Sequence, residues 1–248
     1  MSTEQAVIQF EHTTKRFGRK LAVSDVSGSF PRGSVVGLIG PNGSGKSTLL
    51  KLAAGLIRPT SGKVWVSGNV VNGRIRSGVS FLPDTNSLYP FYTVGETIHY
   101  CVQAFPDFDL NKALKMMEFL ELSHGQKVSH LSKGKYSRLK LVVTLSRETP
   151  LVLMDEPLSG LDPMVRKSIL KSLIEFVDVD WQTVVLSTHE VAEIEPLLDH
   201  VALIHQGQLK GFDTVDNIRA EHNTSLVTWM EALVQEAKEY QGSASVSV

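Results

Sequence analysis

The sequence contains the run Gly40-Pro41-Asn42-Gly43-Ser44-Gly45-Lys46-Ser47-Thr48, which matches the phosphate-loop pattern G-x-x-x-x-G-K-[ST]. The apolar residues 35–39 before it predict a buried strand, and residues 46–56 after it predict a helix. This pattern binds phosphate when it joins a strand to a helix in this way. We therefore predict that this chain binds a nucleoside triphosphate through these nine residues.

Each part of the run suits a phosphate ligand. The glycines allow a tight loop whose backbone N–H groups point inward, and the start of the following helix adds a positive partial charge. Lys46 adds a full positive charge, and the hydroxyl of Ser47 is expected to bind the Mg²⁺ of the nucleotide. The alternative is a glycine-rich turn with a surface lysine, which the flanking strand and helix disfavour.

Length and composition narrow the class of protein. A chain of 248 residues can form one large α/β domain or a core with an inserted subdomain. Lys and Arg number 25 against 26 Asp and Glu, so the net charge of −1 gives no electrostatic sign of a nucleic-acid partner. Cys101 is the single cysteine and cannot form an intrachain disulfide, which suits a reducing compartment. We find no secretory signal and no run of apolar residues long enough to span a bilayer.

The spacing of apolar residues outlines the domains. Short apolar runs bounded by turns predict strands at 7–10, 27–30, 63–66, 79–82, 151–154, 183–187, 200–204 and 208–212. Helical spacing predicts helices at 94–105, 111–122, 136–147, 163–177, 190–198 and around 226–237. We expect an α/β fold: a P-loop NTPase core with a mostly parallel sheet and an N-terminal antiparallel β subdomain, plus an inserted α-helical subdomain. The core is assigned to 1–85 and 150–240, the insertion to 86–149 and a flexible tail to 241–248.

A second set of residues points to hydrolysis. Asp155-Glu156-Pro157 follows a buried strand, at the end where open α/β sheets bind their ligands. We expect Asp155 to hold Mg²⁺ and Glu156 to polarise the attacking water, although a solvated acidic turn is the alternative. His189 also follows a buried strand, and we interpret it as a sensor of the γ-phosphate in preference to a structural hydrogen-bonding residue.

From about Val7 to Leu233, the ordered set of motifs resembles the ATP-binding subunits of ABC transporters. The resemblance implies that Asp155 is the Mg²⁺-binding aspartate, Glu156 the catalytic glutamate and His189 the switch histidine. It implies that Ser159-Gly160-Leu161-Asp162 crosses a dimer interface, with Asp162 at the nucleotide. Phe17 falls where the family stacks an aromatic ring on adenine, and its alternative is a core phenylalanine.

Two positions depart from the family pattern. The signature segment, LSGGQ in the family, reads Leu131-Ser132-Lys133-Gly134-Lys135 here. Ser132 and Gly134 are kept, and they are the residues expected to contact the γ-phosphate of ATP. An LSKG-type signature resembles a bacterial branch of exporters, so we expect export. Asp84 stands where the family has a glutamine; it can still reach the water shell of the metal, but it adds negative charge beside ATP.

The resemblance also implies partners and a location. ATP and Mg²⁺ are expected to lie between two ATP-binding subunits, in a homodimer or a heterodimer, with Ser132 and Gly134 of one facing the phosphate loop of the other. The helical subdomain, with Asp84 at its entry, would form a groove for a short helix of a separate transmembrane permease. The chain is therefore expected to be cytoplasmic and peripheral on the inner face of the cell membrane. The alternatives are a hydrolysis-impaired regulatory subunit and a soluble ABC-type ATPase without a transport role.

Overall fold

The computed structural model describes residues 6–71, 78–222 and 225–244. In chain order its elements are β1 (Ala6–Phe17), β2 (Lys20–Pro31), β3 (Val35–Ile39), α1 (Lys46–Ala53), β4 (Ser61–Val66), β5 (Asn69–Val70), β6 (Val79–Leu82), α2 (Val94–Ala104), α3 (Leu110–Phe119), η2 (Val128–His130), α4 (Lys133–Leu145), β7 (Leu151–Asp155), α5 (Pro163–Phe176), β8 (Thr183–Thr188), α6 (Val191–Ile194), η3 (Glu195–Leu197), β9 (His200–His205), β10 (Gln208–Thr214), α7 (Val215–His222) and α8 (Leu226–Ala244).

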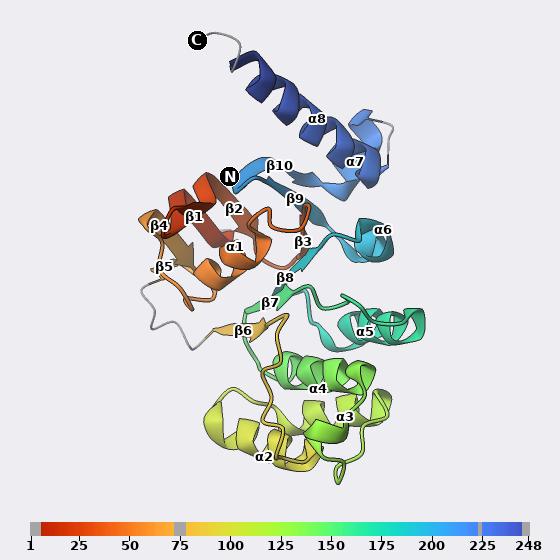
Figure 1. Cartoon of the computed structure of the whole chain (residues 1–248). Helices are drawn as coiled ribbons and strands as arrows, with labels where there is room; N and C mark the ends of the chain where they lie inside the picture. The colour runs from red at the N-terminus through yellow and green to blue at the C-terminus, as the bar shows by residue number, and fades with distance from the viewer. Residues whose placement is uncertain (1–5, 72–77, 223–224, 245–248) are drawn as a thin grey trace.

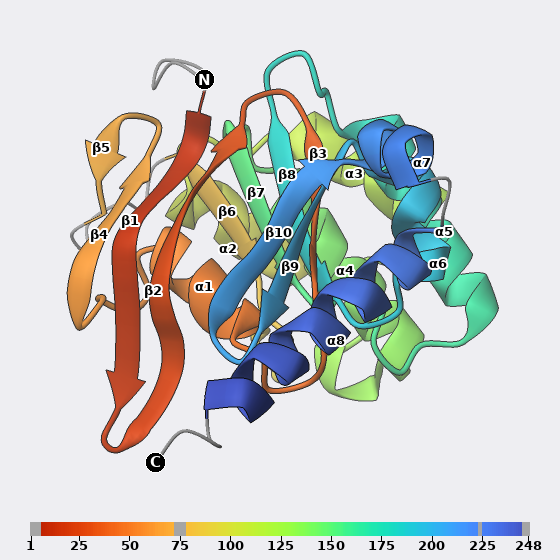
Figure 2. The same ribbon diagram turned by 90° about the horizontal axis from the view of Figure 1, so that it is seen from above.

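Two sheets build the core. The larger has the strand order β10-β9-β3-β8-β7-β6, and all its neighbours pair in parallel except β10 with β9. The smaller, with the order β2-β1-β4-β5, is antiparallel and lies to one side of the larger sheet (Figure 2). The predicted α/β core with a mostly parallel sheet and an antiparallel β subdomain is confirmed. Its central strands are β3, β8 and β7, and each of them leads into a segment of the predicted site.

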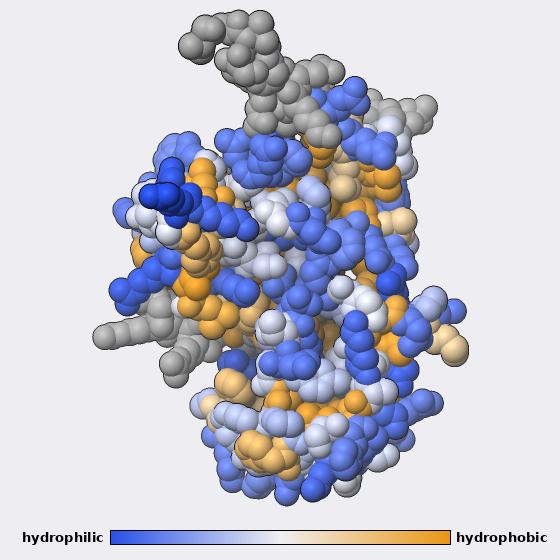
Figure 3. All heavy atoms as spheres, in the orientation of Figure 1, coloured by the Kyte–Doolittle hydropathy of each residue, from blue (hydrophilic) through white to orange (hydrophobic). Residues whose placement is uncertain are grey.

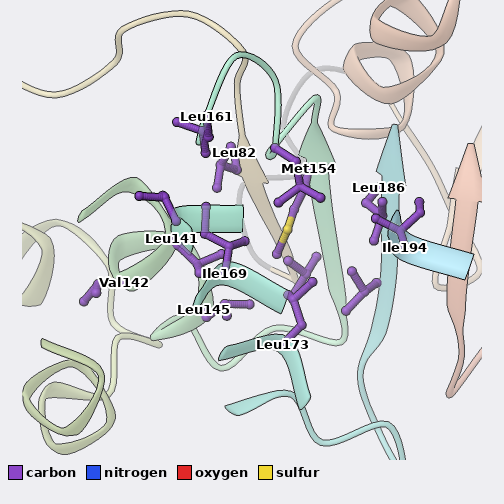
Figure 4. Packing of buried hydrophobic residues seen from close by; sticks show 14 of the residues in the cluster. Leu82, Leu141, Val142, Leu145, Met154, Leu161, Ile169, Leu173, Leu186 and Ile194 are labelled. Atoms are coloured by element: carbon purple, nitrogen blue, oxygen red, sulfur yellow. The ribbon is translucent and has the colours of Figure 1, made fainter. Parts of the chain in front are cut away.

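Side chains alternate between the two faces of the parallel sheet. On β7, Val152 and Met154 join one hydrophobic cluster, while Leu151 and Leu153 join the other. The first cluster lies towards α4 and α5, and Figure 4 shows Leu141 of α4 and Ile169 of α5 converging with Met154. The second cluster lies towards α1 and the antiparallel sheet. Because both faces are covered, the strands read as continuous apolar runs, as expected for a parallel sheet.

The helical subdomain lies at one end of the molecule, beyond the edge strand β6 (Figure 1). It begins with α2, whose first turn carries a capping box: Glu96 N–H donates to Thr93 Oγ1, and Thr93 N–H donates to Glu96 Oε2. The core of this subdomain includes Met116 and Met117 of α3. These residues belong to the same hydrophobic cluster as the buried residues of α4. α4 therefore joins the insertion to the edge of the nucleotide-binding core.

Some elements differ from the sequence prediction. Strands β1 and β2 are 12 residues each and form one long hairpin, which is longer than the runs 7–10 and 27–30. The predicted helix 190–198 is divided into α6 and the 3₁₀ turn η3, which contains Pro196. Helix α8 runs to Ala244, so it enters the predicted flexible tail 241–248, and residues 245–248 lie outside the described residues.

Cys101 on α2 gives a first prediction, on thiol reactivity. Its side chain is 3% exposed, and burial raises the pKa of the thiol to about 11. Because the thiolate is the reactive form, iodoacetamide at pH 8 should leave Cys101 of the folded protein unmodified over an hour. In 8 M urea the same reagent should label Cys101 faster, by roughly two orders of magnitude in rate. Mass spectrometry of both samples measures this. Equal labelling rates would show that Cys101 is accessible in the folded chain.

Candidate functional site

The phosphate loop connects β3 to α1, as its sequence predicts. Gly40 has φ 150°, and a Cβ atom placed on it would lie 2.1 Å from the carbonyl oxygen of Ile204. Gly45 has φ 113°, and a Cβ there would lie 2.5 Å from the carbonyl oxygen of Ala22. Any side chain would therefore clash at these two positions, and only glycine allows the loop to close against β9 and β2. The N-terminus of α1 consequently faces the loop, an arrangement that favours an anion.

Lys46 is the first residue of α1 and is 5% exposed. Its ammonium group donates to the carbonyl of Gly40 at 2.7 Å and to that of Pro41 at 3.2 Å, so it lies across the loop. It also lies 3.3 Å from Glu156 Oε1. The hydroxyl Oγ of Ser44 in the same loop is buried and has no hydrogen-bond partner among the described residues. A buried cation and an unpaired buried hydroxyl in a glycine-rich loop are what a phosphate group requires.

Ser47 and Asp155 form the part of the site that suits Mg²⁺. The Ser47 hydroxyl donates to Asp155 Oδ1 at 2.7 Å, and the Ser187 hydroxyl donates to the same oxygen at 2.9 Å. Asp155 is 1% exposed. Carboxylate and hydroxyl oxygens are hard ligands, and Mg²⁺ usually binds one or two carboxylates together with substrate phosphates. The described residues contain no group of three or more His, Cys, Asp or Glu side chains that could hold a metal ion by themselves.

Glu156 and His189 meet at the ends of adjacent strands β7 and β8. His189 Nδ1 and Glu156 Oε2 are 2.9 Å apart, within hydrogen-bonding distance. Glu156 has a positive φ of 49°, and its backbone N–H donates to Ser187 Oγ at 2.9 Å. A left-handed conformation at a non-glycine residue is uncommon and is held here by its surroundings. The structure thus brings together the two residues predicted to be catalytic, beside Lys46.

A pocket joins these groups to the antiparallel sheet. It is lined by residues of the phosphate loop and α1 together with Asp84, Glu156, Lys20 and Ala22. Lys20 and Ala22 lie on β2, and no pattern in the sequence indicated them, because their place depends on the pairing of β2 with β1. Phe17 is the cross-strand neighbour of Lys20 and is 49% exposed, so it is not the core phenylalanine of the alternative interpretation. Its ring lies 5.1 Å from Lys15 Nζ, and its stacking on adenine stays a prediction.

Ser132 and Gly134 occupy the start of α4, away from this pocket. Ser132 is the N-cap, and its Oγ accepts a hydrogen bond from Lys135 N–H at 3.3 Å. A Cβ on Gly134 would lie 2.8 Å from Val165 Cγ2, so the glycine allows α4 to pack closely on α5. Neither residue is among those that line the pocket of the phosphate loop in the described part of the chain. Their contact with ATP, which would come from a second subunit, stays a prediction.

Asp162 has a structural task in this chain. It caps α5, where its Oδ1 accepts from Met164 N–H at 3.1 Å and from Val165 N–H at 3.0 Å. The loop before it contains Gly160, with φ 63°, and a Cβ there would lie 2.2 Å from Lys133 Nζ. The unusual lysine of the signature segment thus fits against a glycine of the loop predicted to cross the dimer interface. The contact of Asp162 with nucleotide stays a prediction.

Two supporting residues had no signal in the sequence. Ser187 holds both Asp155 and the backbone of Glu156, but a serine inside a buried strand is indistinguishable from a packing residue. Arg166 on α5 donates to the carbonyl of Leu161 at 2.9 Å and pairs with Glu190, the residue after His189. It therefore connects the loop before α5 to the segment after β8. Finding it requires knowing that these two segments are neighbours in space.

Comparison with known sequences finds one family along the chain. A family model described as ABC transporter matches residues 23–159. The chain is 31% identical over 228 residues to a probable sulfate/thiosulfate import ATP-binding protein CysA of Chlorella vulgaris, which covers 89% of this chain and 97% of that protein. It is 34% identical over 211 residues to the Nod factor export ATP-binding protein I of Burkholderia lata, covering 82% of this chain and 69% of that one. It spans 61% of the Fe(3+) ions import ATP-binding protein FbpC 1 of Pectobacterium atrosepticum, at 30% identity.

Solved structures share the fold. An ATP-binding subunit of an ABC transporter superposes with a TM-score of 0.81 at 26% identity, covering 92% of this chain and 99% of that one. A dimeric ATP-binding cassette, solved in a post-hydrolysis state with ADP and phosphate, superposes with a TM-score of 0.74 at 23% identity, covering 84% and 98%. The second likeness is one of fold alone.

Proposed function

Because this chain belongs to the ABC transporter family as an ATP-binding subunit, and such subunits are ATPases that power transport, we propose that its phosphate-loop pocket binds ATP with Mg²⁺ and hydrolyses it between two subunits. The observation that carries this proposal is a chain of contacts around one pocket. Lys46, Ser47 and Glu156 line that pocket, Ser47 donates to Asp155, and Glu156 lies beside His189. Lys46 and the loop N–H groups would bind the phosphates. Mg²⁺, when bound to Ser47 and Asp155, supplies charge neutralisation at the phosphates.

Hydrolysis is assigned to the pair Glu156 and His189. Glu156 Oε1 faces Lys46 and Oε2 faces His189, so the carboxylate is held at both oxygens and oriented towards the phosphate loop. A held carboxylate can orient a water and accept its proton. His189 would sense the γ-phosphate through the ring nitrogen that does not face Glu156. The alternative is a regulatory subunit that is impaired in hydrolysis. A purified chain that binds ATP but shows no Mg²⁺-dependent ATPase activity would support that alternative.

Pairing of two subunits is supported by exposed residues at the start of α4 and after the loop of Gly160 and Asp162. Ser132 and Lys133 at the start of α4 are exposed, and Met164, directly after the loop of Gly160 and Asp162, is 81% exposed. A large apolar side chain so exposed beside the predicted interface would be covered by a partner subunit. ATP that touches both subunits would stabilise the closed pair, and ADP would hold it less well. Cleavage then reopens the pair.

A separate permease is proposed because no helix in the described ranges is long and apolar enough to cross a membrane. The surface we assign to it is an aromatic cluster formed by Tyr89, Phe91, Tyr92 and Tyr100, whose ring centroids lie 4.8–6.0 Å from those of their neighbours. Three of its members, Tyr89, Phe91 and Tyr100, are exposed. Figure 3 shows hydrophobic residues reaching the surface over the helical subdomain. Exposed clustered aromatics are typical of a surface that binds another protein. Through the permease the chain would sit on the inner face of the cell membrane.

The aromatic cluster gives a second prediction, on membrane association. Phe91→Ser should reduce the fraction of the chain that sediments with membranes of its host cell by about tenfold, since one buried aromatic anchor contributes roughly 1–3 kcal/mol to an interface. Ile174→Ser is the matched control, because Phe91 and Ile174 are both 66% exposed and Ile174 lies on α5. Immunoblots of the membrane and supernatant fractions measure the effect. Equal loss in both variants, or loss in neither, would remove the cluster from this role. An unmodified chain that does not sediment with membranes would favour the soluble ABC-type ATPase.

The direction of transport is proposed from the signature segment alone. Its LSKG-type sequence favours export. The relatives named above include both import and export proteins, so export stays a prediction. The membrane protein encoded beside this chain, if one is found, decides the matter through its own class and number of spans.

A further inference from the structure

Lys140 is a buried lysine that the proposed hydrolysis does not use. It lies in the middle of α4 and is 8% exposed. Its ammonium group donates to the carbonyl of Pro83 and, at 3.3 Å, to the carbonyl of Thr85. These two carbonyls flank Asp84, the residue that stands where the family has a glutamine. A cation on α4 therefore holds the backbone on both sides of Asp84.

A second side chain of α4 holds the same segment further along. Tyr136 lies one helical turn before Lys140, and so on the same face of α4. Its hydroxyl oxygen accepts hydrogen bonds from Ser87 N–H at 2.8 Å and from Leu88 N–H at 3.0 Å. The segment 83–88, which leaves the edge strand β6, is thus bound to α4 at both ends. The start of the same helix carries Ser132, which is proposed to meet the ATP of the partner.

Charge is the second reason for a lysine at this place. Burial lowers the pKa of Lys140, whereas the carboxylates of Asp84 and Asp155 raise it, so the ammonium lies within the electrostatic reach of both. A buried ammonium is costly unless it is paired or hydrogen-bonded, and packing alone would be served better by leucine or methionine. Lys46 already faces Glu156. Lys140 is consequently a second buried cation beside the site, held next to Asp84 through the neighbouring carbonyls.

We propose that Lys140 is a positioning residue for Asp84: it fixes the backbone on both sides of that aspartate and offsets the negative charge that Asp84 adds beside Asp155. The inference rests on the proposed function, in which Asp84 and Asp155 face the Mg²⁺ of bound ATP. Without the ammonium, the site would carry one more net negative charge near the triphosphate, which would weaken its binding. The aspartate that departs from the family pattern thereby keeps its place at the site through a lysine inside α4.

A double-mutant cycle on the full chain tests this. The variants are Lys140→Met, Asp84→Asn and the double variant, with Lys140→Arg to keep the charge. Tyr136→Phe is the matched control, because it releases the same segment at Ser87 and Leu88 without changing charge. Two quantities are measured for each: the urea midpoint of the nucleotide-free protein, and the affinity for a non-hydrolysable ATP analogue with Mg²⁺ by calorimetry. Should Lys140→Met not fold, Lys140→Gln, which keeps a donor for the carbonyls, takes its place.

Lys140→Met is expected to weaken Mg²⁺–nucleotide affinity about tenfold, the scale of one partly screened charge. Asp84→Asn should restore most of that affinity in the Lys140→Met background, and the losses in urea midpoint should be less than additive. The Mg²⁺–nucleotide affinity of Lys140→Arg should stay within about threefold of that of the unmodified chain, and so should the affinity of Tyr136→Phe. Additive losses in both measurements, or unchanged affinity in Lys140→Met, would show that Lys140 serves packing alone.

Failure of this inference is distinguishable from failure of the proposed function. Lys46→Ala is measured in the same calorimetric series. If Lys46→Ala loses nucleotide binding while Lys140→Met binds normally, the pocket is the nucleotide site and only the role of Lys140 is rejected. If Lys46→Ala also binds normally, the nucleotide site itself is wrong.

Discussion

Replacement of Glu156 by glutamine is expected to leave ATP binding intact and to slow Mg²⁺-dependent hydrolysis by roughly two or more orders of magnitude. Glutamine has the shape of glutamate and can occupy the same left-handed backbone position beside Ser187. It cannot accept the proton of the attacking water. The glutamine amide can still touch Lys46 and His189, but without a negative charge both contacts are weaker. Steady-state ATPase assays and calorimetry with ATP measure the two quantities separately.

The control for this variant is Glu148→Gln. Glu148 is a carboxylate whose side chain is 43% exposed and which pairs with Lys112 on the helical subdomain, so its loss should leave the rate within about twofold. An unchanged rate in Glu156→Gln would remove Glu156 from the catalytic role. A rate lost together with ATP affinity would indicate a binding role instead.

Replacement of Lys46 by alanine is expected to abolish detectable nucleotide binding. The ammonium is buried in the phosphate loop, and its removal takes away the full positive charge that would face the β- and γ-phosphates. Truncation of one partner of a buried charged pair costs about 2–5 kcal/mol, which is roughly 30- to several-thousand-fold in affinity. Calorimetric titration with ATP and Mg²⁺ measures the loss.

Lys51→Ala is the matched control for Lys46→Ala, because Lys51 lies in the last turn of the same helix α1. It should bind nucleotide like the unmodified chain. The removal of Lys46 also leaves Glu156 without a cation, so the thermal midpoint of the nucleotide-free protein should be recorded for both variants. Retained affinity in a folded Lys46→Ala chain would contradict the assignment of the loop as the phosphate site.

Much of the site was readable from the sequence because its residues are fixed by local chemistry. The phosphate loop requires glycine at positions 40 and 45, because a Cβ atom there would clash with another segment. This requirement is visible in the sequence as a fixed spacing of glycines. Glu156 and His189 directly follow two adjacent parallel strands, and parallel strands end at one edge of a sheet, so their meeting follows from topology. The fold class, the family and the convergence of the catalytic pair were all accessible in this way.

The remaining features depend on tertiary pairing, which leaves no local pattern. The place of Lys20 at the pocket follows from the register of a hairpin whose two strands have 12 residues each but were predicted as short runs. Lys140 reads as one more charged residue in a helix, and only the packing of α4 beside β6 reveals its contact with the segment around Asp84. The helix predicted after His189 is divided into α6 and η3, and η3 contains Pro196. Whether a proline ends a helix depends on whether the fold lets the chain turn there. Such features are known only when distant segments are placed side by side.

Sharing of each ATP between two cassettes is tested by light scattering on the Glu156→Gln chain. With ATP and Mg²⁺ at concentrations that calorimetry shows to fill the site, we expect a particle of twice the mass of the chain, or of the chain plus a related cassette. A second change, Ser132→Arg at the exposed start of α4, should return it to single mass without loss of ATP binding. A particle that keeps the mass of one chain at full occupancy, with every related cassette supplied, would show that ATP is not shared between two cassettes.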